Sequence, residues 1–306
     1  MRPKLIAGLP LLVLFACSST PSGPITVNPE QAAHDDFVQR LAEALRRPPE
    51  EDAPTALNTL EHLLPAWQAD QRRGRAAPLE NILTIKVVSH FDDVLLAFQT
   101  GTRERRLVAA WALGFSRVPE NDLGLVSPHP AARDALVSAL REPDDELLRN
   151  VLLGLWKLGD EETPLPPLMD VLVQHHDPDV RANAALALGT VLRPATAAAA
   201  GDALLVALGD AEPKVRVHAA TVVRRFPSPA ATQRLLALLP AEQTPLVRAA
   251  MATALGAARE RQAAPELVDM LGSPREIEAL AARDALVEIF GQDRGPNASD
   301  WEALLP

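Results

Sequence analysis

The sequence predicts an all-α protein in which pairs of helices stack into a solenoid. Three observations lead to this fold class. A short pattern, clearest as DPDVRANAALALG at residues 177–189, returns several times along the chain. Apolar residues within each copy recur with helical spacing. The composition is 47% hydrophobic but only 4% aromatic, with no Tyr, so the core must consist of Ala, Leu and Val, which suit closely packed helices.

The N-terminal stretch MRPKLIAGLPLLVLFAC predicts an export signal, residues 1–16. Two positive charges precede an apolar run from Leu5 to Phe15, too short to span a bilayer but long enough for a signal-peptide core. Its end, LFAC, resembles the bacterial lipobox, and a lone cysteine would otherwise be an odd thiol in an exported chain. The resemblance implies a lipid-anchored Cys17, and Ser18 resembles the outer-membrane sorting pattern. An ordinary signal peptide is the alternative.

Between this signal and the repeats, the sequence predicts a tether and a helical cap. Residues 17–30 are rich in Ser and Pro and have no apolar period, so we expect a flexible tether. Residues 31–100 contain amphipathic stretches without the repeated pattern, and they predict an N-terminal helical cap. These stretches are HDDFVQRLAEALRRP, TALNTLEHLLPAWQ and LENILTIKVVSHFDDVLLAFQ, with QADQRRGRAAP as a polar loop.

The repeats are expected to occupy residues 101–294, and they align on the arginine of DPDVR. Equivalent arginines stand 32 to 43 residues apart. They are Arg106, Arg149, Arg181, Arg216, Arg248 and Arg283. The longest interval contains SRVPENDLGLVSPHP, which we expect to form a longer loop on one rim. The tail, residues 295–306, is expected to be a loose end with one capping turn at Trp301.

Each repeat carries signals for two helices. Asp177 suits an N-cap, Pro178 suits the first helical position, and Asp179 adds negative charge near the positive end of the helix dipole. A glycine eight residues after the arginine is placed to act as a C-cap. These glycines are Gly114, Gly189, Gly256 and Gly291. A second apolar segment, such as LPPLMDVLV or GDALLVAL, follows the first. Neither helix can bury its face alone, so the units must stack.

This pattern of Asp-Pro, Val-Arg and Ala-Leu-Gly resembles the bacterial HEAT-like repeat of the PBS-lyase type. The resemblance covers about residues 101 to 291. It implies a right-handed superhelix and a structural ladder, in which the repeated arginines pair with acids between neighbouring units. Acids close enough in sequence are Asp145, Asp179, Glu212 and Glu278. A row of anion contacts is the alternative interpretation of the arginines.

Motifs for catalysis or cofactor binding are missing from the sequence. There is no GxSxG, glycine-rich phosphate loop, HExxH or paired CxxC, so no catalytic residue and no cofactor is predicted. His175, His176 and Asp177 lie together, and a metal can use His and carboxylate ligands. Adjacent helical residues point about 100° apart, however, so we expect the two histidines not to converge on one ion, and no metal site is predicted.

The expected partner is a protein. A formal net charge of −10 argues against nucleic acid and anionic lipid as primary ligands. The HEAT resemblance implies that the second helices line a concave binding face. Four of the second apolar segments place an acid between apolar neighbours, and the fifth segment carries a Gln-Arg pair there. The residues are Asp134, Asp170, Asp202, Gln233, Arg234 and Glu266. They predict a mildly acidic stripe for a partly basic protein segment; ordinary solvated helix surface is the alternative.

These expectations predict a lipid-anchored, non-enzymatic interaction scaffold at the bacterial outer membrane, facing the periplasm. The alternative is an accessory subunit or chaperone-like partner of an enzyme, because the repeat also resembles lyase subunits that attach bilin pigments to antenna proteins. A third class is a stand-alone hydrolase or metal protein. His175 and its neighbours are the one feature of the sequence that would support it.

Overall fold

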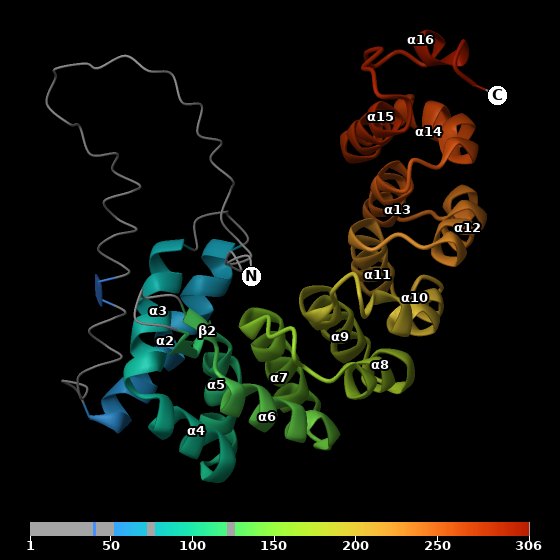
Figure 1. The fold of residues 1–306 in the computed structure, drawn as a ribbon. Coiled ribbons are helices and arrows are strands. Elements are labelled where there is room, and N and C mark those ends of the chain that lie inside the picture. The colour runs from blue at the N-terminus through green and yellow to red at the C-terminus, as the bar shows by residue number, and fades with distance from the viewer. Residues whose placement is uncertain (1–38, 41–51, 72–76, 121–125, 306) are drawn as a thin grey trace, which may run out of the picture.

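A computed structural model describes residues 39–40, 52–71, 77–120 and 126–305, and in these the chain is an α-solenoid bent into an arc (Figure 1). The all-α solenoid predicted from the repeats is confirmed. Cys17, the expected signal and tether, and nearly all of the first expected cap helix lie outside the described residues. Within the described parts, no helix combines the length and the apolar character needed to cross a membrane.

Between residue 52 and the repeats, the structure describes three helices. They are α2 (Ala53–Gln71), α3 (Ala77–Ser89) and α4 (Phe91–Thr100). The helical stretch expected at residues 79–99 is divided between α3 and α4, because the chain turns at the buried His90, which precedes α4. Helix α2 packs on α3 and on the first helix of the repeats, so this region is continuous with the solenoid.

The repeats consist of a first and a second helix in each unit. The first helices are α5 (Arg103–Ala112), α7 (Asp145–Leu158), α9 (Pro178–Val191), α11 (Pro213–Arg225), α13 (Pro245–Ala257) and α15 (Glu276–Phe290). The second helices are α6 (Pro130–Ser138), α8 (Leu165–Gln174), α10 (Gly201–Ala207), α12 (Pro229–Leu238) and α14 (Ala264–Leu271). Short 3₁₀ turns extend several of them, including η1 (Leu113–Phe115), which follows α5.

The predicted helix start at Asp177 is confirmed. Its carboxylate accepts hydrogen bonds from the backbone N–H groups of Asp179 at 2.8 Å and Val180 at 3.0 Å, while Pro178 occupies the first helical position. Asp144 caps α7 in the same way. These bonds satisfy donors that a helix cannot pair internally.

The glycines have two different roles, and the predicted C-cap is wrong for three of them. Gly291 ends α15 with φ 71° and fits the prediction. Gly114, Gly189 and Gly256 instead lie where successive first helices touch. A Cβ on Gly256 would lie 2.6 Å from the Cα of Ala285, and one on Gly189 would lie 2.9 Å from the side chain of Val222. The missing side chain therefore permits close helix packing.

This close packing determines which layer lies inside the arc. The first helices pack directly on one another from α7 to α15, more closely than the second helices do. In Figure 1 the first helices accordingly follow the inner side of the arc, and the second helices follow the outer side. The expectation that the second helices line the concave face is therefore wrong, because the small residues that bring neighbouring units together belong to the first helices.

The first unit and the C-terminal tail carry additional structure. The insertion expected as a loop contains strands β1 (Arg117–Pro119) and β2 (Val126–Pro128), paired antiparallel. The tail forms α16 (Ser299–Glu302) and is docked rather than loose. The Trp301 side chain is fully buried, and its indole N–H donates to the carbonyl of Gly295 at 2.9 Å.

Candidate functional site

The predicted ladder is best seen at Arg181, which links two turns. One nitrogen of its guanidinium donates to the backbone carbonyls of His175 at 2.9 Å and His176 at 3.0 Å, in the turn before its own helix. The other two nitrogens donate to the carboxylate of Asp210, both at 2.8 Å. Asp210 lies in the turn before α11, so Arg181 joins its own unit to the next.

Arg216 repeats this arrangement one unit further on. It donates to the carbonyls of Asp210 and Ala211, and its other nitrogens donate to the carboxylate of Glu242 at 2.7 and 2.9 Å. Three more arginines of the predicted ladder pair with an acid of the next unit, as Arg106–Glu142, Arg149–Asp177 and Arg248–Glu278. The turns and the arginines thus alternate along one rim.

The acids of the ladder differ from most of those expected. Glu278 does pair with Arg248, at 3.6 Å. Asp179 instead pairs with Lys214, and Asp145 faces two histidines. Glu212 is the N-cap residue of α11, but its side chain accepts no capping hydrogen bond there. The other ladder acids lie in the turn before the next first helix, where they can also accept backbone N–H groups.

Arg283 does not belong to the ladder, and its assignment there is wrong. Its Nε donates to the carboxylate of Asp293 at 3.0 Å, just beyond the end of its own helix. It is the eighth residue of α15, whereas Arg181 and Arg216 are the fourth residues of α9 and α11. Alignment on the arginine alone missed this difference in helical position.

The ladder arginines lower the pKa of three of its acids, Asp177, Asp210 and Glu242. The hydrogen bond from Arg149 lowers the pKa of Asp177 to about 2. Burial raises the pKa of Asp210, but the hydrogen bond from Arg181 and backbone N–H donation outweigh that effect, and the net pKa is lowered. Glu242 follows the same balance, with Arg216 as its cation. Charge-assisted pairs of this kind favour the charged form.

The residues of the expected acidic stripe lie on the outer layer, not on the concave face. Asp170, Asp202, Gln233 and Arg234 are exposed on α8, α10 and α12. The other two members have partners within the chain: Asp134 pairs with Arg133 at 2.8 Å, and Glu266 pairs with Arg248 at 3.1 Å. Two of the six side chains are therefore already paired within the chain, and all six lie on the second helices.

The inner layer offers a different surface. The ninth residues of four successive first helices, α7 to α13, are partly or fully exposed and carry no charge. They are Leu153, Leu186, Thr221 and Thr253. At the C-terminal end of this layer, Leu246 of α13 and Ile277 and Leu280 of α15 are exposed by 52%, 46% and 52%. We define these three as the apolar patch; Leu246 and Ile277 are each the second residue of adjacent first helices, and exposed apolar patches often mark a binding surface.

An aromatic cluster closes the N-terminal end, and sequence reasoning missed it. Trp67 of α2 lies edge-on to Trp111 and Phe115, with ring centroids 5.7 and 5.2 Å apart. The Lys157 ammonium lies 5.3 Å from the Phe115 centroid and pairs with Glu80 of α3. Burial lowers the pKa of Lys157. The cluster attaches α2 and α3 to the first repeats. No local sequence pattern marks it, because Trp67 and Trp111 lie 44 residues apart in the chain.

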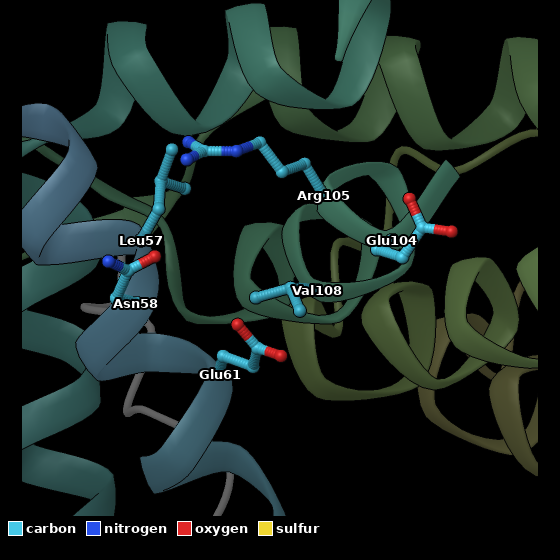
Figure 2. A pocket seen from close by; sticks show the side chains of 6 residues that line it. All are labelled: Leu57, Asn58, Glu61, Glu104, Arg105 and Val108. Carbon is cyan, nitrogen blue, oxygen red and sulfur yellow. The ribbon is translucent and has the colours of Figure 1, made fainter. Parts of the chain in front are cut away.

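A shallow hollow lies between α2 and α5 (Figure 2). Its lining residues are Leu57, Asn58, Glu61, Glu104, Arg105 and Val108. Among these six there is no Ser, Cys or His that could act as a nucleophile or as its base, so the hollow provides none of the arrangements typical of nucleophilic catalysis.

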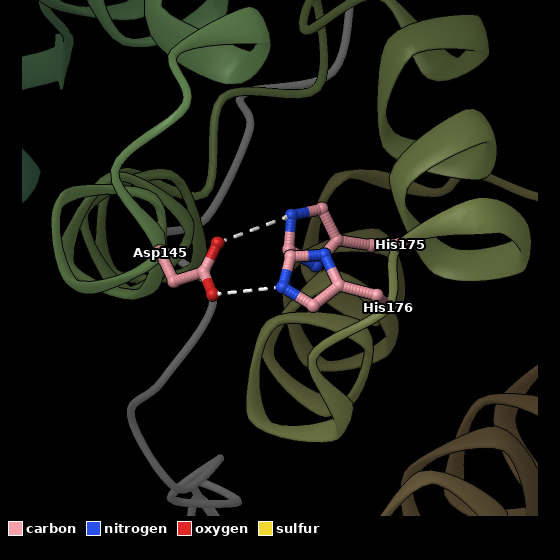
Figure 3. A group of neighbouring side chains, drawn as sticks. All are labelled: Asp145, His175 and His176. Carbon is pink, nitrogen blue, oxygen red and sulfur yellow. Dashed lines mark ion pairs between the residues drawn. The ribbon is translucent and has the colours of Figure 1, made fainter.

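The two histidines converge, contrary to the expectation from helical geometry. Helix α8 ends at Gln174, and His175 has an extended backbone with φ −70° and ψ 138°. The two imidazoles stack with centroids 4.6 Å apart. Their Nε2 atoms face the carboxylate of Asp145, at 3.7 Å for His175 and 3.0 Å for His176 (Figure 3). The prediction failed because it assumed that the helix continues through both residues.

The repeats can now be compared with known families. The sequence model described as HEAT repeats matches residues 133–200 and 201–287, just over half of the chain. The chain belongs to the HEAT-repeat family. The match covers most of the ladder but not the aromatic cluster of α2 and α3 or the docked tail. None of the curated proteins compared with this HEAT-repeat protein matches it.

Solved structures similar to this HEAT-repeat protein have low sequence identity to it. An engineered protein is 18% identical, with a TM-score of 0.48, over 88% of this chain and 83% of that one. Human deoxyhypusine hydroxylase in complex with glycerol is 18% identical, with a TM-score of 0.37, over 86% and 99%. The complex of CpcE and CpcF of phycocyanin lyase from Nostoc sp. PCC7120 is 19% identical, with a TM-score of 0.41, over 80% and 89%.

Proposed function

We propose that this HEAT-repeat protein is a non-enzymatic scaffold that binds a protein partner along its inner layer and is held in the bacterial cell envelope through Cys17. The observation that carries the proposal is the apolar patch of Leu246, Ile277 and Leu280 on two adjacent first helices. These side chains remain exposed although both helices are otherwise packed into the core.

The ladder makes the inner layer suitable for binding. Each first helix from α5 to α13 is tied near its N-terminal end to the next unit by an arginine–acid pair. Their side chains are therefore already held at set intervals before a partner arrives. A preformed surface lowers the entropic cost of binding, so more of the contact energy appears as affinity.

The chemistry of the partner follows from the surface. A partner that covers the apolar patch needs apolar side chains at its contact, since buried apolar anchors supply most of the affinity of an interface. The net charge of −10 attracts a segment that also carries basic residues. We therefore expect an amphipathic, partly basic protein segment.

The test is capture of the partner with matched surface variants. Wild-type protein purified from membranes should bring down a dominant partner, and the double variant Leu246→Asp with Ile277→Asp should lose it. The control is Val173→Asp with Val206→Asp, which places the same charges on exposed apolar residues of the second helices α8 and α10. A partner that is retained by the first variant contradicts the proposal. If the partner is an enzyme, an accessory role is supported.

The envelope anchor has its own test. Cys17→Ala removes the only cysteine of the chain and should move the protein from the membrane fraction to the soluble fraction, because acyl chains supply the anchor. Mass spectrometry of the wild-type N-terminus should show a diacylated or triacylated cysteine. An unmodified Cys17 would rule the anchor out. It would leave the binding proposal untouched, because the patch variants test that proposal separately.

A further inference from the structure

We propose that Asp145, His175 and His176 form a surface site for a divalent transition-metal cation of the Zn²⁺ type. One ligand atom from each residue lies within 4.8 Å of the others. The proposal is independent of the partner-binding role and concerns a different part of the molecule. Figure 3 shows both imidazoles pointing from one turn toward a carboxylate at the start of α7.

The turn that carries the histidines is held in place. The guanidinium of Arg181 donates to the carbonyl oxygens of His175 and His176, at 2.9 and 3.0 Å. The carboxylate of Asp177 in the same turn pairs with Arg149. A site whose ligands stand on a fixed backbone loses less freedom when it binds an ion. This separates the cluster from a chance meeting of surface side chains.

The donor set selects the class of metal. Two imidazole nitrogens and one carboxylate oxygen suit Zn²⁺, Ni²⁺ or Cu²⁺, whereas Mg²⁺ and Ca²⁺ favour oxygen ligands alone. Zn–N bonds measure about 2.0–2.1 Å, so an ion placed between the rings and the carboxylate has to draw the three side chains together. The side chain of His176 is 77% exposed and can make that movement, and water can occupy the remaining coordination positions.

One contact sets the expected affinity. The Nδ1 of His175 accepts the backbone N–H of Asp177 at 3.2 Å, so in the neutral ring the proton lies on Nε2. A neutral imidazole that binds metal through Nε2 carries its proton on Nδ1. Binding therefore moves that proton to Nδ1 through solvent and breaks the contact with Asp177. Because this contact is lost, we expect micromolar affinity for Zn²⁺.

The place of the site predicts a second effect. Asp145 begins α7 of one unit, while the histidines lie in the turn that leads into α9 of the next. A bound ion would therefore connect consecutive units at the same joint as the pair of Arg149 and Asp177. Since the ion binds the folded arrangement, it should raise the thermal midpoint in proportion to the logarithm of its concentration.

The experiment is titration of the full chain with ZnCl₂, in a Cys17→Ala background so that no thiol competes. We expect one ion per chain by isothermal titration calorimetry and a rise in thermal midpoint with Zn²⁺. His176→Ala should weaken the binding at least tenfold and abolish the thermal shift, and Asp145→Asn should weaken it as well. The control, His62→Ala, removes an exposed histidine of α2 and should leave both readouts unchanged.

Two outcomes would overturn the proposal. One is the absence of Zn²⁺ binding up to millimolar concentration, and the other is wild-type affinity in His176→Ala. Circular dichroism of each variant ensures that a loss of binding is not a loss of fold. Electron paramagnetic resonance with Cu²⁺ adds a direct readout: coupling to two imidazole nitrogens is expected in the wild type, and coupling to one is expected in His176→Ala.

Discussion

Arg181 and Arg216 each turn one nitrogen to backbone carbonyls of their own unit and two nitrogens to a carboxylate of the next. Arg216 and Glu242 keep only 15% and 8% of their side-chain surface exposed. A guanidinium in such a place is satisfied only when both turns are folded. The arginine–acid pair therefore forms only when consecutive units stack, and it stabilises that stacking.

Replacing Arg216 with Ala should destabilise the solenoid by about 3 kcal/mol. The substitution leaves the nearly buried carboxylate of Glu242 without its cation, and an uncompensated buried charge costs several kcal/mol. Urea unfolding followed by circular dichroism measures the change. Arg283→Ala is the matched control, because Arg283 pairs only with Asp293 in an exposed position, and its unfolding curve should nearly superimpose on that of the wild type. Equal losses in both variants would contradict the distinction between them.

Stability should fall in acid as the ladder carboxylates take up protons. The folded-state pKa of Asp177 is about 2, below its ordinary value of 3.8, and those of Asp210 and Glu242 are also lowered. A lowered folded-state pKa means that the contribution is fully present above the ordinary value and is lost as pH falls through the lowered one. The thermal midpoint should therefore be nearly constant from pH 7 to about 5 and fall between about pH 4 and pH 2.

The acid effect can be assigned with one variant. Asp177→Asn cannot gain a proton in this range, so its midpoint should be lower at neutral pH but should depend less on acid than that of the wild type. Asp170→Asn, on the exposed surface of α8, is the control and should follow the wild-type curve. An identical acid slope in Asp177→Asn would show that the ladder is not the cause.

At the scale of helices, the glycines set the distance between neighbouring units. Gly114 and Gly154 meet where η1 packs on α7, since a Cβ on Gly114 would lie 2.7 Å from the carbonyl oxygen of Gly154. Gly256 makes the equivalent approach to α15. The sequence places a glycine at these positions, but it does not show whether the residue ends a helix or lies against the next one.

Gly256→Ala should destabilise the protein by about 1–3 kcal/mol. The added methyl would meet the Cα of Ala285 at 2.6 Å, so two helices must move apart, and overpacking has this usual cost. Gly201→Ala is the matched control, because nothing lies within 4 Å of a Cβ there and the residue opens α10. Alanine favours the helix at that position, so chemical denaturation should show equal or greater stability.

The limits of sequence-based prediction are clear at this scale. Asp177 as an N-cap and the stacking of helix pairs followed from local chemistry. The acids of the ladder did not, because Asp210 and Glu242 lie 29 and 26 residues beyond their arginines, whereas the sequence favoured nearer carboxylates. The histidine pair was misjudged because the end of α8 at Gln174 could not be located to one residue. The apolar patch needed a structure, since exposure depends on which helix face the neighbours cover.

For the whole molecule, tryptophans cover both ends of the array. Trp67 closes the N-terminal end among Trp111, Phe115 and Trp156, and Trp301 packs near Phe290 at the other end. In an array where units contact mainly their neighbours, the terminal units have one unpaired face, and covering it prevents fraying. The cluster at the N-terminal end is therefore primarily structural.

Trp67→Ala should release the N-terminal end without unfolding the rest. The large cavity that it leaves should cost about 3–5 kcal/mol, and this loss should remain local because units interact with their neighbours. Hydrogen exchange with mass spectrometry should show faster exchange in α2, α3 and α5 and wild-type protection in α11 and α13. Trp301→Ala should produce the reverse pattern, confined to α15 and the tail. Uniformly faster exchange in either variant would contradict this independence.

The close packing of the first helices also has a mechanical consequence. In a bent beam, one surface keeps its length while the material outside it stretches or compresses. The inner layer is placed to be that neutral surface, since arginine–acid pairs fix the helix starts and glycine contacts fix their far ends. Flexing of the arc should then change the spacing of the second helices most. A partner bound to the inner layer would meet side chains at constant intervals, whatever the curvature.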